Sequence, residues 1–193
     1  MPALVAGVGV VQDGESLRIR DGSVADTRLL VEMFDEAVAW LVERGQPGQW
    51  GERPWSSRPE ALAFVDRLVG SGGLRIAELD GEPAGAVVVG ERPAHVPPVE
   101  HPELYVNLLL VSRRHAGKKF GNRLVQVAID AARAAGLDML GVDCWAGAPT
   151  LVAWYLRQGF TPNGTFELNG WRGQIFEMSL TCGGHALSGP SDA

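Results

Sequence analysis

Cysteine is scarce in this sequence, and long apolar segments are absent. Only two cysteines, Cys144 and Cys182, occur in 193 residues, and they form no spaced motif. A disulfide-stapled scaffold is therefore excluded, and a reducing, cytoplasmic compartment is expected. No apolar run approaches the roughly 18 residues of a membrane-spanning helix. The apolar run at residues 3–11 follows no basic residues, which argues against a secretory signal peptide.

Several catalytic and nucleotide-binding signatures are also missing. The chain contains neither G-x-x-x-x-G-K-[ST] nor G-x-G-x-x-G, so neither nucleotide fingerprint applies. The four histidines, His95, His101, His115 and His185, are too scattered for a recognisable metal site, and we expect no metal. Because Cys144 has no obvious base partner and no Ser-His-Asp arrangement follows from the residue order, a covalent enzyme intermediate is disfavoured.

The composition that remains is that of one acidic, globular domain. The formal net charge is −6, with 46% hydrophobic and 21% charged residues, which is ordinary for a soluble protein with a substantial core. The acidic balance argues against general nucleic-acid binding. No repeat or long linker divides the chain, so we expect a leader over residues 1–15, a single domain over 16–180 and a disordered tail over 181–193.

Hydrophobic periodicity and turn signals predict both strands and helices. Asp80-Gly81 between two apolar runs is a strong hairpin signal. Strands are predicted at 16–20, 74–79, 84–89, 104–111, 139–145, 160–166 and 171–180, and helices at 24–44, 58–69, 123–136 and 149–157. This order predicts an α/β (α+β) fold, with a mixed, mostly antiparallel sheet of about six to seven strands and helices on both faces.

The stretch 104–136 is the most informative part of the chain. It reads LYVNLLLV, SRRHAGKKFGN and RLVQVAIDAARAAG, which predicts a buried strand, a basic glycine-containing loop and a helix. The loop window carries Arg113, Arg114, Lys118, Lys119 and Arg123, and no acidic residue lies between positions 104 and 129. Unpaired N–H groups and the dipole at a helix N-terminus favour anions, so the stretch predicts a polyanion site. A solvated basic turn would carry the same charges.

Two segments of the chain resemble the GCN5-related N-acetyltransferase (GNAT) superfamily. They are LLLVSRRHAGKKFGNRLVQVAI and LVAWYLRQGF, in the family's order and spacing, and the resemblance extends over about residues 17–180. It implies transfer of an acyl group, most often acetyl from acetyl-CoA, to an amine of a small molecule or peptide. Direct attack in a ternary complex is the implied route, with no metal.

The resemblance also implies a coenzyme A site. Backbone groups of Leu109, Leu110 and Val111 would bind the pantetheine. The pyrophosphate would lie on the N–H groups of the following loop, which comprises Ala116, Gly117, Lys118, Lys119, Phe120, Gly121 and Asn122. Two positions depart from the family loop [RQ]-x-x-G-x-[GA], because Ala116 replaces Arg or Gln and Lys119 replaces glycine. The second departure matters if the backbone needs a positive φ there.

Catalytic roles follow from the same resemblance. Tyr155 matches the family tyrosine that acts as general acid toward the leaving thiolate; its alternative role is packing against the sheet. The family's central-strand glutamate falls near Asn107, which is no base. Asp143 is the best remaining carboxylate, ahead of Glu103, although it could instead serve in a surface salt bridge. A water relay to solvent would also suffice.

The resemblance also implies an acceptor site around the first two helices, their connecting loop and the loop between the last strands. Gln49 lies in that connecting loop, with carboxylates at Glu43 and Glu52 nearby. Aromatic walls with a few carboxylates would suit an organic amine through stacking or cation–π contact. Tryptophans in such loops also often only seal the helix layer onto the sheet. The candidate substrate-binding residues are Trp40, Trp50, Trp55, Asn107 and Trp145.

Two other functions fit the same sequence. An aminoacyl-tRNA donor would suit the basic loop, although the net acidity argues against nucleic acid. A non-catalytic acyl-CoA-binding protein would explain the family departures at Asn107, Lys119 and Ala148. An exposed edge on the last strands would also permit a homodimer.

Overall fold

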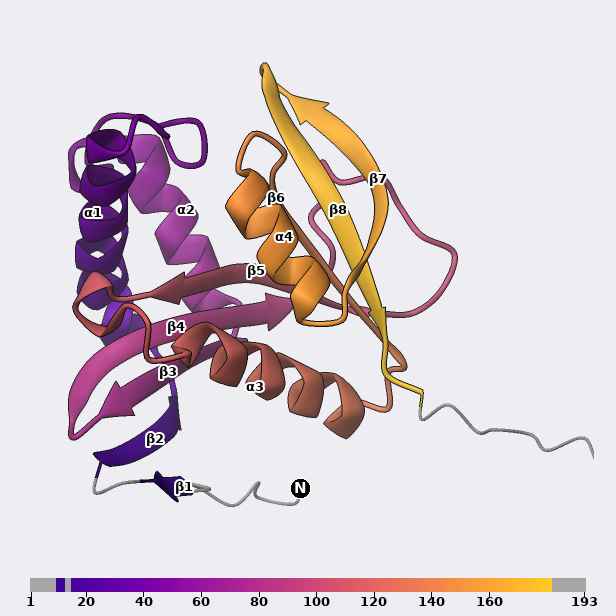
Figure 1. Cartoon of the computed structure of the whole chain (residues 1–193), viewed down its shortest axis with the longest axis horizontal. Coiled ribbons are helices and arrows are strands. Elements are labelled where there is room, and N and C mark those ends of the chain that lie inside the picture. Colours follow the sequence, from indigo (N-terminus) through magenta and orange to yellow (C-terminus); the bar gives the residue numbers. More distant parts are fainter. Residues whose placement is uncertain (1–9, 13–14, 182–193) are drawn as a thin grey trace, which may run out of the picture.

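The computed structural model describes residues 10–12 and 15–181, and these form one sheet covered by helices on both faces (Figure 1). The sheet has eight strands in the order β1-β2-β3-β4-β5-β6-β8-β7. Neighbouring strands are antiparallel except for β5 and β6, which are parallel. The strands are β1 (Val10–Gln12), β2 (Glu15–Asp21), β3 (Leu74–Leu79), β4 (Glu82–Gly90), β5 (Leu104–Val111), β6 (Met139–Trp145), β7 (Thr161–Leu168) and β8 (Trp171–Ser179).

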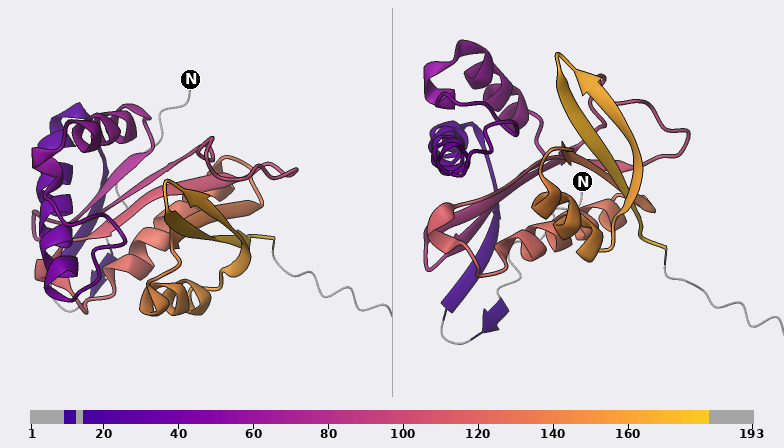
Figure 2. Two further views of the ribbon diagram at one scale, coloured as in Figure 1. Left: turned by 90° about the horizontal axis from the view of Figure 1, so that it is seen from above. Right: turned by 45° about the horizontal axis from the view of Figure 1, so that its top comes forward.

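The helices divide between the two faces of the sheet, as the sequence predicts (Figure 2). α1 (Thr27–Glu43) and α2 (Pro59–Gly70) share a buried core with Ile76, Val88 and Leu108. α3 (Phe120–Ala134) and α4 (Pro149–Arg157) pack on the other face. Three short 3-10 turns, η1 (Val24–Asp26), η2 (Trp55–Ser57) and η3 (Arg113–His115), lie between the described elements. No helix among the described residues is long and apolar enough to span a membrane.

An ion-pair network anchors the start of α1 to the sheet. Ser23 caps the preceding turn, and its own backbone N–H donates to the carboxylate of Asp26 at 2.8 Å. Arg20 of β2 pairs with Asp26 at 2.6 Å and with Glu78 of β3 at 2.5 Å. The Arg20 guanidinium holds the pKa of Asp26 below its usual range. This network fixes the position from which α1 runs along the cleft described below.

The main departure from the predicted fold is at the N-terminal edge. Part of the expected leader forms β1, which pairs with β2 and makes the sheet one strand larger than expected. The remaining leader residues, 1–9 and 13–14, lie outside the described residues, as does the expected tail from 182 onward. The predicted hairpin at Asp80-Gly81 is confirmed, because β3 and β4 are antiparallel neighbours across it, with a register shift between Ala77 and Glu78.

The central strand β5 contains a bulge where it separates from β6. Val88 of β4 pairs with Leu108, whereas Val89 pairs with Val106, so Asn107 is the extra residue on β5. On its other side β5 pairs with β6 only from Leu104 to Val106. Beyond the bulge the two strands diverge, and no described strand pairs with that edge of β5. The sheet is therefore open between β5 and β6.

Candidate active site

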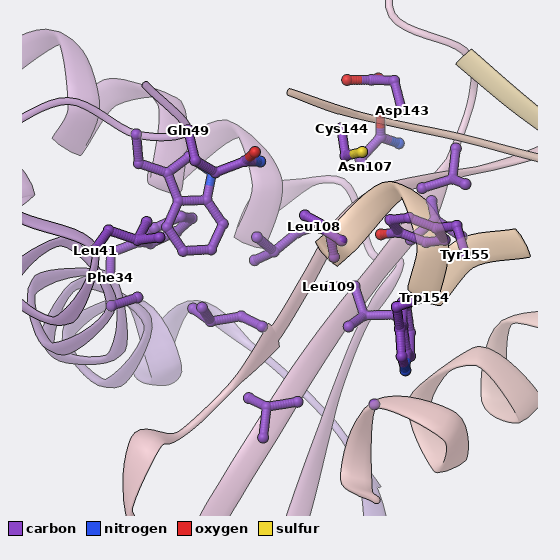
Figure 3. A pocket seen from close by; sticks show the side chains of 18 of the residues that line it. Phe34, Leu41, Gln49, Asn107, Leu108, Leu109, Asp143, Cys144, Trp154 and Tyr155 are labelled. Atoms are coloured by element: carbon purple, nitrogen blue, oxygen red, sulfur yellow. The ribbon is translucent and has the colours of Figure 1, made fainter. Parts of the chain in front are cut away.

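A cleft of about 1040 Å³ lies over the opening between β5 and β6. Figure 3 shows Leu108 and Leu109 between the two walls of the cleft. Phe34, Leu41 and Gln49 lie on the side of α1, and Trp154 and Tyr155 of α4 lie on the opposite side. The volume is at the upper end of the range for small-molecule and cofactor pockets, which suits a large ligand or two ligands at once.

The N-terminus of α3 opens into this cleft with unpaired backbone donors. Among the described residues, the N–H groups of Gly117, Lys119, Phe120 and Gly121 have no hydrogen-bond acceptor. Together with the helix dipole, these donors are suited to binding an anion. Of the ten residues predicted to bind the coenzyme, nine line the cleft; Lys118 is the exception.

Lys119 adopts the left-handed conformation that the family glycine would adopt freely. Its φ and ψ are +61° and 22°, and it is the N-cap of α3. A β-carbon in this conformation is strained, at a cost of about 1–2 kcal/mol. The loop is thus left-handed at this position with a lysine in place of the family glycine.

Asp143 and Tyr105 form a hydrogen-bonded pair at the start of the opening. The Tyr105 hydroxyl donates to Asp143 Oδ2 at 2.7 Å. Burial raises the pKa of Asp143, against the opposing effect of this hydrogen bond. Tyr105 pairs with Gly141 of β6, and Asp143 directly follows Val142, the last β6 residue that pairs with β5. Asp143 lines the cleft. A carboxylate with a raised pKa in a cleft is suited to general-base catalysis.

Tyr155 lies on the other side of the sheet opening. Its ring is 5% exposed and stacks on Phe176 at 5.4 Å between centroids. It shares a core cluster with Cys144, the strand neighbour of Asp143. Because successive strand residues point to opposite faces, Asp143 and Tyr155 approach the opening from opposite faces. Burial raises the pKa of Tyr155, so the phenol keeps its proton at neutral pH. Burial likewise raises the pKa of the Cys144 thiol to about 12, which makes it a poor nucleophile.

Two of the candidate acceptor tryptophans are structural parts of the cleft wall. Trp55 is 8% exposed and stacks on Phe34 with ring centroids 3.8 Å apart. Its indole N–H donates to the backbone carbonyl of Trp50 at 3.1 Å, and Trp50 packs edge-on against Phe34. Both tryptophans line the cleft, but they also seal α1 and α2 onto the sheet.

The other candidate acceptor residues occupy different positions. Asn107 lines the cleft, and its side-chain amide donates to the Glu91 carbonyl at 3.2 Å. Trp40 lines it as well. Trp145 lies instead in a neighbouring hollow between the α1–α2 loop and the turn joining β7 to β8. There its backbone N–H donates to Gln49 Oε1 at 3.1 Å.

The carboxylates expected beside the tryptophans are not in the cleft. Glu43 and Glu52 are exposed and do not line it, although Glu52 lines the neighbouring hollow with Trp50, Trp55 and Trp145. Glu103 is unavailable as a base because both of its carboxylate oxygens bind Arg92, at 2.5 and 3.2 Å. Glutamates placed close in sequence to aromatic residues need not share their face of a helix or loop.

One carboxylate cluster among the described residues has a geometry that could hold a metal. It comprises His101, Glu103 and Glu177. Arg92 already bonds to both glutamates, at 2.5 Å and 3.4 Å, and so supplies the positive charge that a metal would bring. This cluster is an ion-pair network behind Tyr105, whose ring lies 5.0 Å from the Arg92 guanidinium.

Sequence reasoning missed two functional contacts of the site. Tyr105 was interpreted only as part of an apolar strand, although a tyrosine on a buried strand needs a partner for its hydroxyl. Gln49 was noted for its position, but its bond to Trp145 spans 96 residues and has no local signal. Both depend on the distance between β5, β6 and the α1–α2 loop, which the sequence alone does not specify.

Comparisons with known proteins agree with this geometry. Residues 32–160 match the model of the acetyltransferase (GNAT) family. A GNAT-family acetyltransferase from Listeria monocytogenes 4b F2365 superposes with a TM-score of 0.68 at 19% identity, covering 90% of this chain and 100% of that one. YncA from Salmonella typhimurium, solved with its cofactor acetyl-CoA, gives 0.61 at 19% identity, covering 92% and 98%. A chimera of spermidine N-acetyltransferase SpeG from Vibrio cholerae and hSSAT gives 0.60 at 18%, covering 85% and 95%. No curated protein sequence gives a significant match.

Proposed function

The chain belongs to the GNAT acetyltransferase family, and we propose that it transfers the acetyl group of acetyl-CoA to the amine of a small acceptor by direct attack in a ternary complex. The observation that carries the proposal is the opening between β5 and β6, which leads along the cleft to the N-terminus of α3. A thioester arm and its diphosphate need these two features in one continuous cleft.

The free edge of β5 would bind the pantetheine arm. From Asn107 to Val111 the backbone groups on the β6 side have no strand partner among the described residues, so they are available to an amide-containing ligand. The diphosphate would accept hydrogen bonds from the N–H groups of Gly117, Lys119, Phe120 and Gly121. The lysine ammonium would add charge next to the phosphates.

Asp143 and Tyr155 would serve the two proton movements of the transfer. Asp143 accepts a proton from the acceptor amine as nitrogen attacks the thioester carbonyl. The C–N bond forms, the C–S bond breaks, and Tyr155 donates its hydroxyl proton toward the thiolate as charge develops on sulfur. Because burial makes the phenol a weaker acid than in water, its main contribution is a hydrogen bond in the transition state.

Two measurements test the proposal. The purified protein is first titrated with acetyl-CoA, and a panel of amines is then assayed for release of free thiol. We expect saturable binding that desulfo-coenzyme analogues compete for, and thiol release that requires an amine. Binding without thiol release with any amine would indicate a non-catalytic acyl-CoA-binding protein. Absence of binding would remove the coenzyme assignment.

A further inference from the structure

The charged residues that line the cleft are mostly basic, although the whole chain is acidic. Arg67, Arg113 and Lys119 line it, whereas Asp143 is its only carboxylate among the described residues. The net charge of the chain is −6. Lys119 lies at the N-terminus of α3, but Arg113 contacts α1 and has no assigned role in coenzyme binding. A cleft that bound only a cationic acceptor would not be expected to carry this charge.

Arg113 and Arg44 share one aromatic ring, with Glu36 as the acidic residue that acts on Arg113. The Arg113 guanidinium lies 3.7 Å from the centroid of Trp40, and that of Arg44 lies 4.5 Å from it. Among the described residues, neither arginine forms an ion pair, whereas Arg114, the next residue, pairs with Glu36 at 3.1 Å. The Nε of Arg113 is buried and has no hydrogen-bond partner in the described chain.

This arrangement is unfavourable for the free protein. A buried donor without an acceptor costs about 1–3 kcal/mol, and two neighbouring guanidiniums repel one another. Burial and the charge of Arg44 lower the pKa of Arg113, against the opposing charge of Glu36. An anion that bound beside Trp40 would satisfy the donor and offset the repulsion.

We propose that the acceptor is an amino acid with an apolar side chain, whose carboxylate binds Arg113. This inference rests on the proposed acetyltransferase function. A guanidinium binds a carboxylate through two parallel hydrogen bonds, and Arg44 adds attraction from the rim. The apolar side chain would contact Phe34, Leu41 and Trp50, which line the same wall.

The phosphates of the coenzyme are the other source of an anion, since Arg113 precedes Gly117 by only four residues. The Arg113 side chain, however, packs on Trp40 of α1, on one face of the sheet. The N–H groups of the proposed diphosphate site belong to Gly117 and Lys119 of the loop and to Phe120 and Gly121 of α3, which packs on the opposite face. A polyamine acceptor such as spermidine is disfavoured, because Arg113 and Arg67 would repel its additional ammonium groups.

Sets of three matched acceptor compounds test the inference. Leucine and phenylalanine are each compared with the corresponding α-carboxamide and the corresponding decarboxylated amine, at fixed acetyl-CoA. We expect kcat/KM for the amino acid to exceed that for both analogues by roughly 10–100-fold. Arg113→Gln should abolish this preference by raising the KM of the amino acid, and Arg113→Lys should retain part of it. Arg114→Gln, which removes the neighbouring charge outside the cleft lining, should leave the preference unchanged.

A binding measurement separates the two anion sources. Calorimetric titration of the protein–coenzyme A complex with the N-acetyl amino acid should show weaker binding in Arg113→Gln than in wild type, with the affinity for acetyl-CoA unchanged. Weaker acetyl-CoA binding instead would assign Arg113 to a coenzyme phosphate and overturn the inference. Arg44→Gln, at an exposed position, should reduce amino-acid affinity to a smaller degree, even if Arg113→Gln is poorly folded.

Two kinetic results would also overturn the inference. If the decarboxylated amines are acetylated as well as the amino acids, the carboxylate site is wrong while the acetyltransferase function stands. If acetyl-CoA binds but no amine, acidic or neutral, is acetylated, the proposed function fails and the acceptor assignment fails with it.

Discussion

Tyr105 donates a 2.7 Å hydrogen bond to Asp143 at the point where β5 and β6 begin to separate. Behind the phenol, the Arg92 guanidinium lies 5.0 Å from the ring centroid and pairs with Glu103. Tyr105 therefore positions the Asp143 carboxylate from one side, and Asp143 lines the cleft on the other. This relationship supports the proposed role of Asp143 as a base, and it leads to predictions that a surface carboxylate would not meet.

Replacement of Asp143 by Asn should reduce kcat/KM by about 10²–10³-fold, because the amide keeps the shape but accepts no proton. The same change should leave stability equal or higher at neutral pH. Burial raises the pKa of Asp143 in the folded state, so stability falls as pH rises from the unfolded pKa through the folded one. Above that window the folded protein carries the cost of a buried charge, which Asn lacks.

Urea unfolding at pH 7 and at a lower, acidic pH measures the difference in free energy of unfolding between Asp143→Asn and the wild type. The variant should be more stable than the wild type at pH 7. The difference should be smaller at the lower pH, where the wild-type carboxyl is protonated in more of the folded molecules. A variant that loses stability at pH 7 while keeping full activity would place Asp143 in a structural role only.

Replacement of Tyr105 by Phe should move the acidic limb of the kcat/KM profile to higher pH. The hydrogen bond from Tyr105 favours the charged form of Asp143, so its loss raises the pKa of that carboxyl further. The base is then protonated over a wider range, and activity is lost at a higher pH as the solution is acidified. The measurement is a pH profile in both proteins at saturating acetyl-CoA. An unshifted limb would mean that another group titrates.

Replacement of Tyr155 by Phe should lower kcat at least about tenfold and leave acetyl-CoA affinity nearly unchanged. The ring packing on Phe176 and Phe160 is retained, so the fold should persist. Calorimetry gives the affinity, and single-turnover thiol release gives the rate of transfer. An unchanged transfer rate would assign Tyr155 to packing and move proton donation to solvent.

Replacement of Lys119 by Gly should stabilise the fold by about 1 kcal/mol, because its φ of +61° is unstrained only in glycine. Lys119→Ala is the matched control, since it removes the ammonium but keeps the strained β-carbon. If the ammonium binds phosphate, both variants should bind acetyl-CoA more weakly than wild type. Equal or tighter binding by Lys119→Gly would show that only the backbone matters. Urea unfolding and calorimetry together separate the two effects.

The sequence predicted the layers of this fold well, because they follow from local signals. The hairpin at Asp80-Gly81, the buried run of β5 and the helix ending before Gly136 each depend on neighbours in the chain. One feature of the fold could not be predicted in this way. The bulge at Asn107 is a register shift between strands, and a period-2 pattern does not reveal which residue is extra.

The candidate site was predictable where a loop shape determined it and unpredictable where side chains met across the fold. The α3 N-terminus follows from one continuous segment. The bond between Tyr105 and Asp143 joins two strands 38 residues apart. Arg113 was grouped with the basic loop by sequence, yet its contact with Trp40 turns it toward α1. Charge counting located the basic residues but not the direction in which each side chain points.

Replacement of Gly48 by Ala should displace the α1–α2 loop from the end of β6. A β-carbon at Gly48 would lie 2.1 Å from the Trp145 ring, and the adjacent Gln49 bonds to the Trp145 backbone. Because this loop carries Trp50 of the acceptor wall, the KM of the acceptor should rise on the order of tenfold to a hundredfold, with acetyl-CoA affinity retained. Gly70→Ala, where an added β-carbon meets no atom within 4 Å, is the control and should leave both values unchanged. If Gly48→Ala also weakened acetyl-CoA binding, the loop would have to contact both ligands, and the division of the cleft into a coenzyme side and an acceptor side would be wrong.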